Sequence, residues 1–219
     1  MIMKLLITAG PTREPIDPVR FISNPSSGKM GYALAAAAKR RGHSVTLVSG
    51  PVAIEPPRGV RVVRVMTALE MLSAVRENIS NCDALAMAAA VSDFRPASYC
   101  RAKIKKAAMS KVIRLKPNPD ILRQISGKKG KKIFVGFAAE TDDFKAEPLR
   151  KLRSKRLDLI VANNVGRPGS GFETDTNKVT FYFPDGKSLP LPLMSKRSVA
   201  ERIIARIEKS LTSSVLCIK

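Results

Sequence analysis

Lys4-Leu-Leu-Ile-Thr-Ala-Gly10 is followed by a long connection and then by Pro25-Ser-Ser-Gly-Lys-Met-Gly31, which leads into the alanine-rich run 32–41. The apolar residues before the first glycine are typical of a buried parallel strand. The run 32–41 predicts a helix that ends at Gly42, and residues 44–49 predict the next strand. This stretch therefore predicts a β-loop-α-β unit whose glycines lie where the helix begins.

The glycines before this helix allow two interpretations. A helix start offers unpaired N–H groups and a positive dipole end, which favour a phosphate or a carboxylate. Gly31 can instead serve close packing of the helix on the sheet, because the loop 10–28 is too long for the dinucleotide fingerprint and no Walker sequence is present. The loop itself favours phosphate binding, because long connections are usually functional or disordered and this one contains Arg13, Arg20, Asn24 and Lys29.

Strands and helices alternate along the rest of the chain. Strands are predicted at 60–66, 83–90, 112–115, 133–139 and 157–162, and helices at 68–80, from Asn118, from Asp142 or Asp143 to about 156, and at 196–211. Residues 178–183 and 188–193 flank Pro184-Asp-Gly186 and predict a hairpin. We therefore expect an α/β fold, a doubly wound and mostly parallel Rossmann-like sheet with a C-terminal β-hairpin and a flap at 166–177, in a single domain over residues 1–219.

The charge of the chain is extreme, with 39 Lys and Arg against 18 Asp and Glu, or +21. Such a field concentrates polyanions, either nucleic acid or a polyphosphate substrate. A nucleic-acid-binding module is disfavoured because aromatic residues make up 5% of the chain, Trp is absent, and the basic residues are spread over many loops. Neither a basic amphipathic helix nor a transmembrane span stands out, so we expect no membrane partner.

Cysteine and histidine exclude other kinds of site. Cys82, Cys100 and Cys217 lack metal-ligand spacing and fit a reducing compartment, and with no signal peptide we expect a cytoplasmic protein. His43 is the single histidine and is predicted to be a turn residue. A Ser-His-Asp triad and a His-based zinc site are therefore disfavoured. The remaining inventory of Lys, Arg, Asp and Asn suits phosphoryl or nucleotidyl transfer.

Several predicted strands end in small or polar residues. Because ligands of doubly wound sheets bind beyond the carboxyl ends of the strands, Gly10, Ser49 and Ala90 should lie at the binding edge. The segment 88–93, Ala-Ala-Ala-Val-Ser-Asp, brings the carboxylate of Asp93 there. That carboxylate can hold Mg²⁺, bind a ribose hydroxyl or orient a lysine; the alternative is that it only ends the strand.

Three further features also have two interpretations. Lys103 is either a point charge for a phosphate or part of a solvated edge. The Asn118-Pro119 step predicts a helix start, and its backbone can also contact a base or phosphate. Lys151 and Lys155 share one predicted helix face, where they are solvated or repel each other unless an anion lies between them.

Six motifs tie these stretches together. They are Ile7-Thr-Ala-Gly-Pro-Thr-Arg-Glu-Pro15, Phe21-Ile-Ser-Asn-Pro-Ser-Ser-Gly-Lys-Met-Gly31, Ala88-Ala-Ala-Val-Ser-Asp-Phe-Arg95, Lys103-Ile-Lys-Lys106, Asn118-Pro-Asp-Ile121 and Val135-Gly-Phe-Ala-Ala-Glu-Thr141. Over residues 3 to about 211 they closely resemble the bacterial, CTP-dependent phosphopantothenate–cysteine ligase family of coenzyme A synthesis. In bacteria this family often forms the C-terminal half of a bifunctional protein with a flavin-dependent decarboxylase. The chain begins at its own Met1, so we expect a stand-alone ligase or an excised half.

The resemblance implies a two-step reaction with CTP and Mg²⁺. The carboxylate of phosphopantothenate attacks the α-phosphate of CTP and releases pyrophosphate, and the amine of L-cysteine then displaces CMP from the acyl-cytidylate. Asn24 matches a residue that handles the acyl-cytidylate, and Lys103 matches one that stabilises the transferring phosphate. The nucleotide-binding positions that the resemblance implies, with the metal ligands left open, are Ser26, Ser27, Gly28, Gly31, Met87, Ala88, Ala89, Asp93, Lys103, Asn118, Pro119, Asp120, Ile121, Leu122, Phe137, Lys151 and Lys155.

The resemblance also implies a homodimer with the flap 166–177 near the site, and a separate flavin-dependent decarboxylase is a further expected partner. An NAD-dependent oxidoreductase is the other enzyme class considered. It is disfavoured because the tight Gly-x-Gly turn is missing and no acidic residue lies about twenty positions on.

Overall fold

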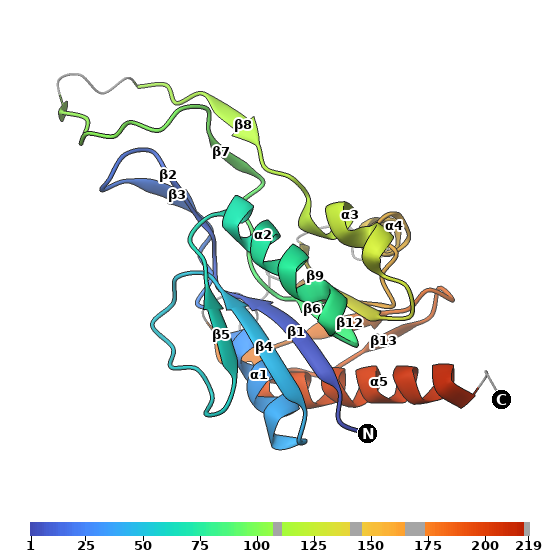
Figure 1. The fold of residues 1–219 in the computed structure, drawn as a ribbon. Helices are drawn as coiled ribbons and strands as arrows, with labels where there is room; N and C mark the ends of the chain where they lie inside the picture. Colours follow the sequence, from blue (N-terminus) through green and yellow to red (C-terminus); the bar gives the residue numbers. More distant parts are fainter. Residues whose placement is uncertain (107–110, 141–145, 165–173, 217–219) are drawn as a thin grey trace.

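The structure is a computed structural model that describes residues 1–106, 111–140, 146–164 and 174–216 (Figure 1). Its centre is an eight-stranded sheet. In spatial order the strands are β13 (Ser188–Pro190), β12 (Val179–Tyr182), β10 (Leu159–Asn164), β9 (Ile133–Glu140), β6 (Ala84–Met87), β1 (Lys4–Ala9), β4 (Ser44–Ser49) and β5 (Arg61–Arg64). The pairings from β5 to β10 are parallel, whereas β12 and β13 are antiparallel. The predicted doubly wound, mostly parallel sheet and its C-terminal hairpin are confirmed.

Helices cover both faces of the sheet (Figure 1). α1 (Lys29–Arg40) and α5 (Lys196–Leu216) pack on one face, and α2 (Ala68–Asn78), α3 (Ile121–Ile125) and α4 (Ala146–Ser154) pack on the other. Alternate residues of each strand supply the two cores, so that Ile7 and Leu47 face α1 while Leu6 and Val48 face α2.

The chain reverses its direction across the sheet between β1 and β6. From β1 it runs to β4 and β5 on one side and then returns to β6 on the other side. Beyond the carboxyl ends of these two strands the pairing continues, since Ala90 N donates to Gly10 O at 2.9 Å and Thr12 N donates to Ala90 O at 3.2 Å. This reversal is the place where open α/β sheets bind ligands.

Two glycines allow close backbone approach at this edge. A Cβ at Gly31 would lie 2.5 Å from the Cβ of Ala9, so the first turn of α1 packs directly on the end of β1. A Cβ at Gly50 would overlap the carbonyl oxygen of Pro11. The interpretation that Gly31 serves close helix–sheet packing is therefore confirmed. This packing is compatible with phosphate binding at the same turn, which stays a prediction.

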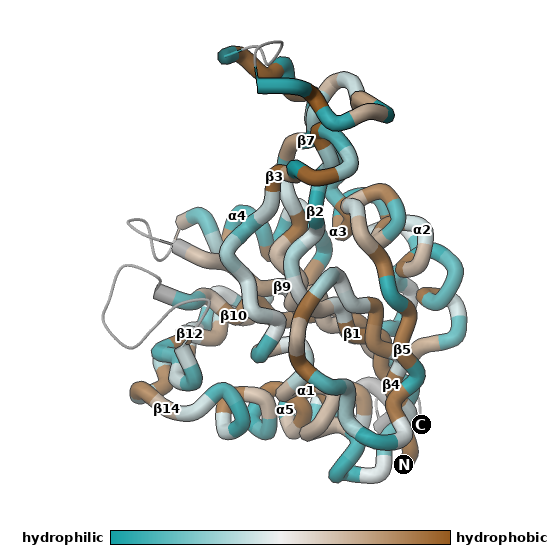
Figure 2. The backbone as a smooth tube through the Cα atoms, turned by 90° about the vertical axis from the view of Figure 1, so that its left-hand side faces the viewer, coloured by the Kyte–Doolittle hydropathy of each residue, from teal (hydrophilic) through white to brown (hydrophobic). Residues whose placement is uncertain are grey.

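A second region, which we call the arm, projects from the carboxyl edge (Figure 2). It comprises residues 13–23 and 94–117, apart from 107–110, which lie outside the described residues. Two short antiparallel ladders form it: β2 (Arg13–Pro15) with β3 (Phe21–Ser23), and β7 (Phe94–Pro96) with β8 (Leu115–Pro117). The long connection after Gly10 therefore contains a short ladder that the sequence did not predict, and the strand predicted at 112–115 is shifted to β8.

Other boundaries differ in smaller ways. α3 begins after Asp120 rather than at Asn118, because the Asp120 carboxylate accepts the N–H of Arg123 at 3.2 Å. α4 ends at Ser154 because Arg156 adopts a left-handed backbone with φ of 53°. His43 directly follows the turn 41–42, where its N–H donates to Ala38 O at 3.1 Å, and its side chain is buried: Nδ1 accepts Met3 N–H at 3.3 Å and Nε2 lies 2.9 Å from Glu208 Oε1.

The remaining short elements are η1 (Ile79–Asn81), η3 (Ser126–Lys128), β11 (Thr176–Asn177) and β14 (Met194–Ser195). The helix start predicted at 142 or 143 lies outside the described residues, as does most of the predicted flap, at 165–173. None of the helices in the described part of the chain combines the length and the apolar character needed to cross a bilayer.

Candidate active site

A cavity of ≈ 240 Å³, which we call the edge cavity, opens beyond the carboxyl ends of β6 and β9. It gathers residues from four separate parts of the sequence, and most of these residues were predicted to contact a nucleotide. Its lining is Met87, Ala89, Val91, Ser92, Asp93, Asn118, Pro119, Asp120, Ile121, Leu122, Phe137 and Lys155.

Asn118 braces this cavity instead of starting a helix. Its amide nitrogen donates to Ser92 O at 2.8 Å, and its amide oxygen accepts from Arg95 at 2.7 Å. Its backbone N–H also donates to Asp93 O at 2.7 Å. The side chain therefore fixes the segment after β6 against the segment before α3, which holds the Asp93 backbone in place.

Lys155 and Asp120 form an ion pair of 2.8 Å on the wall of the edge cavity. A neighbouring cavity of ≈ 400 Å³ shares both residues and is lined further by Arg123, Arg150, Lys151 and Ser154. Lys151 lies there and not in the edge cavity.

The predicted repulsion between Lys151 and Lys155 is relieved by carboxylates of the protein. Asp120 pairs with Lys155, and Glu147 lies 3.5 Å from Lys151. A hydrogen bond from the Arg150 guanidinium is the main reason that the pKa of Glu147 falls to about 2. Glu147 therefore stays ionised at neutral pH, and no bound anion is required to hold these lysines together.

The turn 24–31 lies beside the end of β1. Gly28 caps α1 with a left-handed backbone, φ 78°, and without a side-chain hydrogen bond. Asn24 donates from its amide to Ala90 O at 3.2 Å, and Ser26 N donates to Asn24 O at 2.8 Å. The structure thus brings Asn24, Ser26, Ser27, Gly28 and Gly31 to the edge where β6 ends and Ala88 follows.

Two threonines that sequence reasoning missed hold this edge together. Thr8 Oγ1 accepts the N–H of Ala89 at 3.1 Å, and Thr12 Oγ1 accepts the N–H of Ser92 at 3.0 Å. Both threonines are fully buried. A buried hydroxyl needs a partner, so the position of Thr8 inside an apolar run was the available signal for that residue.

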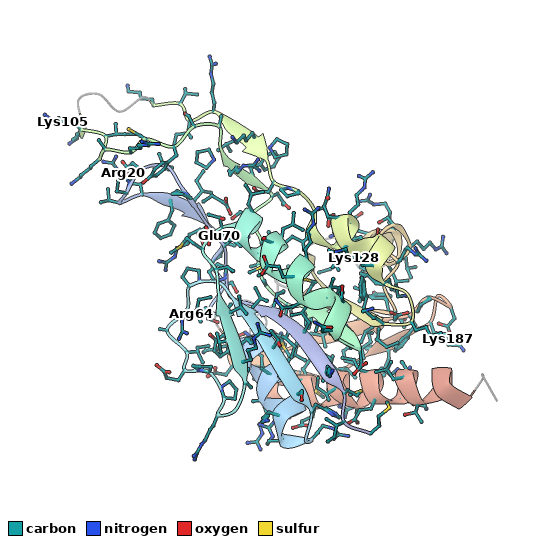
Figure 3. The ribbon with its side chains drawn as sticks, in the orientation of Figure 1. Arg20, Arg64, Glu70, Lys105, Lys128 and Lys187 are labelled. Carbon is teal, nitrogen blue, oxygen red and sulfur yellow. The ribbon has the colours of Figure 1, made fainter. Side chains whose placement is uncertain are left out.

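Lys103 is not brought to the edge cavity. It is exposed on the arm, and Figure 3 shows Lys105, two residues further on, near the far end of that arm. The next residue, Ile104, is held in place because its N–H donates to Asp17 Oδ2 at 3.2 Å and its carbonyl accepts from Arg20 at 3.1 Å. The assignment of Lys103 to the transferring phosphate stays a prediction.

Asp17 is the centre of this contact and was also missed. It accepts the N–H groups of Val19 and Arg20, and its other oxygen lies 2.8 Å from the Arg20 guanidinium. Burial is the largest single influence and raises the pKa of Asp17, but three backbone donors and the charge of Arg20 together lower that pKa below its ordinary value. The three-residue spacing from Asp17 to Arg20 was the signal in the sequence.

The described residues contain no group of three His, Cys, Asp or Glu side chains that converge on one point. Mg²⁺ does not need such a group, because it is usually bound by one or two carboxylates together with substrate phosphates and water. Asp93 lines the edge cavity and fits that role, whereas Asp120 is already paired with Lys155.

The comparisons with known proteins show the family of the chain. The family model described as the DNA/pantothenate metabolism flavoprotein C-terminal domain matches residues 2–211. The chain belongs to this family. It is 47% identical over 204 residues to the coenzyme A biosynthesis bifunctional protein CoaBC of Bacillus subtilis and 46% identical over 209 residues to that of Escherichia coli K12, which covers 93% and 94% of this chain. The family indicated by the sequence motifs is confirmed.

The chain spans about half the length of these relatives, 50% and 51%. Among solved structures, the C-terminal domain of a CoaBC protein superposes with a TM-score of 0.83 at 43% identity, over 96% of both chains. A Cab2 mutant H337A in complex with phosphopantothenate-cysteine superposes with a TM-score of 0.79 at 19% identity, over 97% of this chain and 88% of that one, which shows a shared fold.

Proposed function

We propose that this chain is a CTP-dependent phosphopantothenate–cysteine ligase that acts through an acyl-cytidylate in coenzyme A biosynthesis. The observation that carries the proposal is the edge cavity, which collects Asp93, Asn118, Phe137 and Lys155 on the β6–β9 side of the reversal point of the sheet. The similarity to CoaBC proteins supports the pathway, and the complex of the distant Cab2 structure supports the product class.

In the first step, a carboxylate oxygen of phosphopantothenate forms a bond to the α-phosphorus of CTP, and the bond to the β-phosphate breaks. The positive end of α1, which begins at the turn 26–31, suits the phosphates. The side chains of Asp93 and Lys155 suit the nucleotide, and Mg²⁺ would neutralise phosphate charge at Asp93. Lys103 would add charge from the arm.

In the second step, the amine nitrogen of L-cysteine attacks the acyl carbon, the acyl–oxygen bond breaks, and CMP leaves while the amine loses a proton. The amide of Asn24, anchored on Ala90 O, lies at the β1–β6 edge and would orient the acyl-cytidylate. Walls formed by Phe137, Leu122 and Met87 would limit the access of water to this intermediate.

A homodimer is part of the proposal. The arm leaves large apolar side chains exposed by 40–73%, which suits burial against a second copy. They are Val19, Phe21, Phe94, Tyr99, Val112, Ile113 and Leu115. In a dimer, the arm and its Lys103 would also be able to reach the carboxyl edge of the sheet in the second copy. Sedimentation at working concentration tests this, and a monomer contradicts it.

The whole reaction is tested by incubating the protein with phosphopantothenate and L-cysteine and each nucleoside triphosphate in turn. Pyrophosphate release with CTP, and amide formation only when cysteine is added, is the expected result. Absence of pyrophosphate with all four nucleotides contradicts the proposal. Lys103→Gln should abolish pyrophosphate release while the fold survives, and Asn24→Asp should let acyl-cytidylate accumulate.

A further inference from the structure

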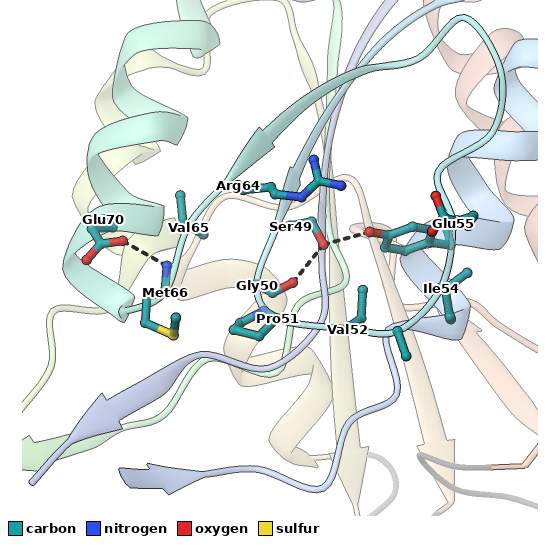
Figure 4. A pocket seen from close by; sticks show the side chains of 12 residues that line it. Ser49, Gly50, Pro51, Val52, Ile54, Glu55, Arg64, Val65, Met66 and Glu70 are labelled. Carbon is teal, nitrogen blue, oxygen red and sulfur yellow. Dashed lines mark hydrogen bonds between the residues drawn. The ribbon is translucent and has the colours of Figure 1, made fainter. Parts of the chain in front are cut away.

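A second cavity, of ≈ 430 Å³, lies beyond the carboxyl ends of β4 and β5 (Figure 4). We call it the β4–β5 pocket. In the sheet order, β1 separates these strands from β6 and β9, so this pocket is distinct from the edge cavity. Its lining is Tyr32, Ser49, Gly50, Pro51, Val52, Ala53, Ile54, Glu55, Arg64, Val65, Met66 and Glu70. Neither the motifs nor the proposed reaction uses it.

The lining presents both signs of charge. Arg64 lies between Glu70 and Glu55 in the view of Figure 4. The side chains of Arg64 and Glu55 form no hydrogen bond or ion pair with any other described residue. Glu70 is held in place, since it accepts Met66 N–H at 2.8 Å and the Thr67 hydroxyl at 3.2 Å.

The rest of the lining is apolar or neutral. Val52, Ile54 and Met66 offer apolar surface, and the Tyr32 hydroxyl is joined to Ser49 Oγ at 3.0 Å. A purely anionic ligand would face two carboxylates, and a purely cationic one would face Arg64. A small molecule with a carboxylate, an ammonium group and a short side chain can pair with Arg64, pair with a carboxylate of the lining, and contact the apolar wall.

We propose that the β4–β5 pocket binds a small α-amino acid, with its carboxylate on Arg64 and its ammonium group on Glu55. This goes beyond the proposed ligase reaction, which guides only the choice of L-cysteine as the first probe. Val52 closes the pocket toward the phosphate-binding turn. Its Cγ1 lies so near the two glycines there that an added Cβ would be 2.9 Å away at Gly10 and 2.7 Å away at Gly28. The pocket is therefore a second amino-acid site, separate from the place where the amine reacts.

The test is calorimetric titration of the full chain with L-cysteine in a reducing buffer, with no CTP and no phosphopantothenate. We expect saturable binding that Arg64→Gln weakens at least about tenfold, as for a charge-assisted hydrogen bond to a carboxylate. Glu55→Gln should weaken it as well. Arg61→Gln removes the same charge from the other end of β5, outside this pocket, and should leave the affinity unchanged.

Two fragments of the ligand sharpen the result. Cysteamine lacks the carboxylate and 3-mercaptopropionate lacks the ammonium group, so each should bind more weakly than L-cysteine. No saturable binding, or equal binding by wild type and Arg64→Gln, overturns the proposal. Pyrophosphate release is measured separately without cysteine, so the failure of this inference and the failure of the ligase proposal are distinguishable.

Discussion

The body of the molecule and its arm are built on opposite principles. In the body, the central strands are apolar on both faces, and Ile7, Leu47 and Leu85 are completely buried between helices. In the arm, each strand is three residues long, and apolar side chains such as Phe94 and Leu115 remain about half exposed. The comparison teaches that the apolar core of the body carries most of the edge cavity, with one contact from Arg95 of the arm to Asn118, whereas the arm depends on local polar contacts and on a surface that covers it.

The largest expected effect is a loss of stability in the body. In Gly50→Ala, the new methyl group overlaps the carbonyl oxygen of Pro11, and only backbone movement relieves the overlap. We expect a loss of about 3 kcal/mol of unfolding free energy or more, measured by denaturant titration. Gly127→Ala is the matched control, because a Cβ there meets nothing within 4 Å. Equal stability of the two variants would contradict the close approach.

The next effect concerns the arm alone. Phe94→Ser combined with Leu115→Ser removes apolar surface that a second copy would bury, at about 25 cal/mol per Å². We expect self-association to weaken at least about tenfold in sedimentation experiments, while the thermal unfolding of the body stays unchanged. Leu189→Ser is the control, since Leu189 is 46% exposed on β13, outside the arm. A dimer as stable as the wild type would remove the arm from the interface.

A smaller expected effect is a loss of CTP affinity when a residue of the edge cavity, outside the arm, is changed. Lys155→Gln removes a cation from the cavity wall, and we expect CTP affinity to fall about tenfold, the value of one charged hydrogen bond. Lys128→Gln removes an equal charge from an exposed position outside the cavity and should have no effect (Figure 3). Unchanged CTP affinity in Lys155→Gln contradicts the role given to this wall.

The smallest effect depends on pH and on Asp17. Its pKa is lower in the folded chain than in the unfolded chain, so its contribution is complete above about pH 4, its unfolded value, and is lost as the pH falls through the folded pKa. Hydrogen exchange at the Ile104 amide should accelerate over that acidic range, while amides of β1 stay protected. Asp17→Asn should accelerate it at neutral pH as well. If neither the lower pH nor Asp17→Asn accelerates exchange at the Ile104 amide, Asp17 does not hold the segment around Ile104 in place.

The body was predictable from the sequence because its central strands are apolar runs and its longer helices show a helical period. β1 and β4 could be placed from residues 4–9 and 44–49 alone, and the edge cavity followed because the carboxyl ends of parallel strands meet. The order of the motifs then supplied the family.

The arm could not be predicted in the same way. β2 and β3 contain three residues each and show no period, and the segment around Ile104 is fixed by a carboxylate 87 positions away in the sequence. The helix start was misplaced because Asn118 and Asp120 are both good caps, and only the structure shows that the Asn118 amide is engaged with Ser92 and Arg95.

Val52 forms part of the wall of two sites at once, the β4–β5 pocket on one side and the glycine turn on the other. Thermodynamic linkage then fixes a reciprocity between them. Whatever factor an amino acid in the pocket applies to the affinity of the turn for a triphosphate, the triphosphate applies to the affinity of the pocket for the amino acid. A single branched side chain would in this way let the protein respond jointly to the supply of two metabolites.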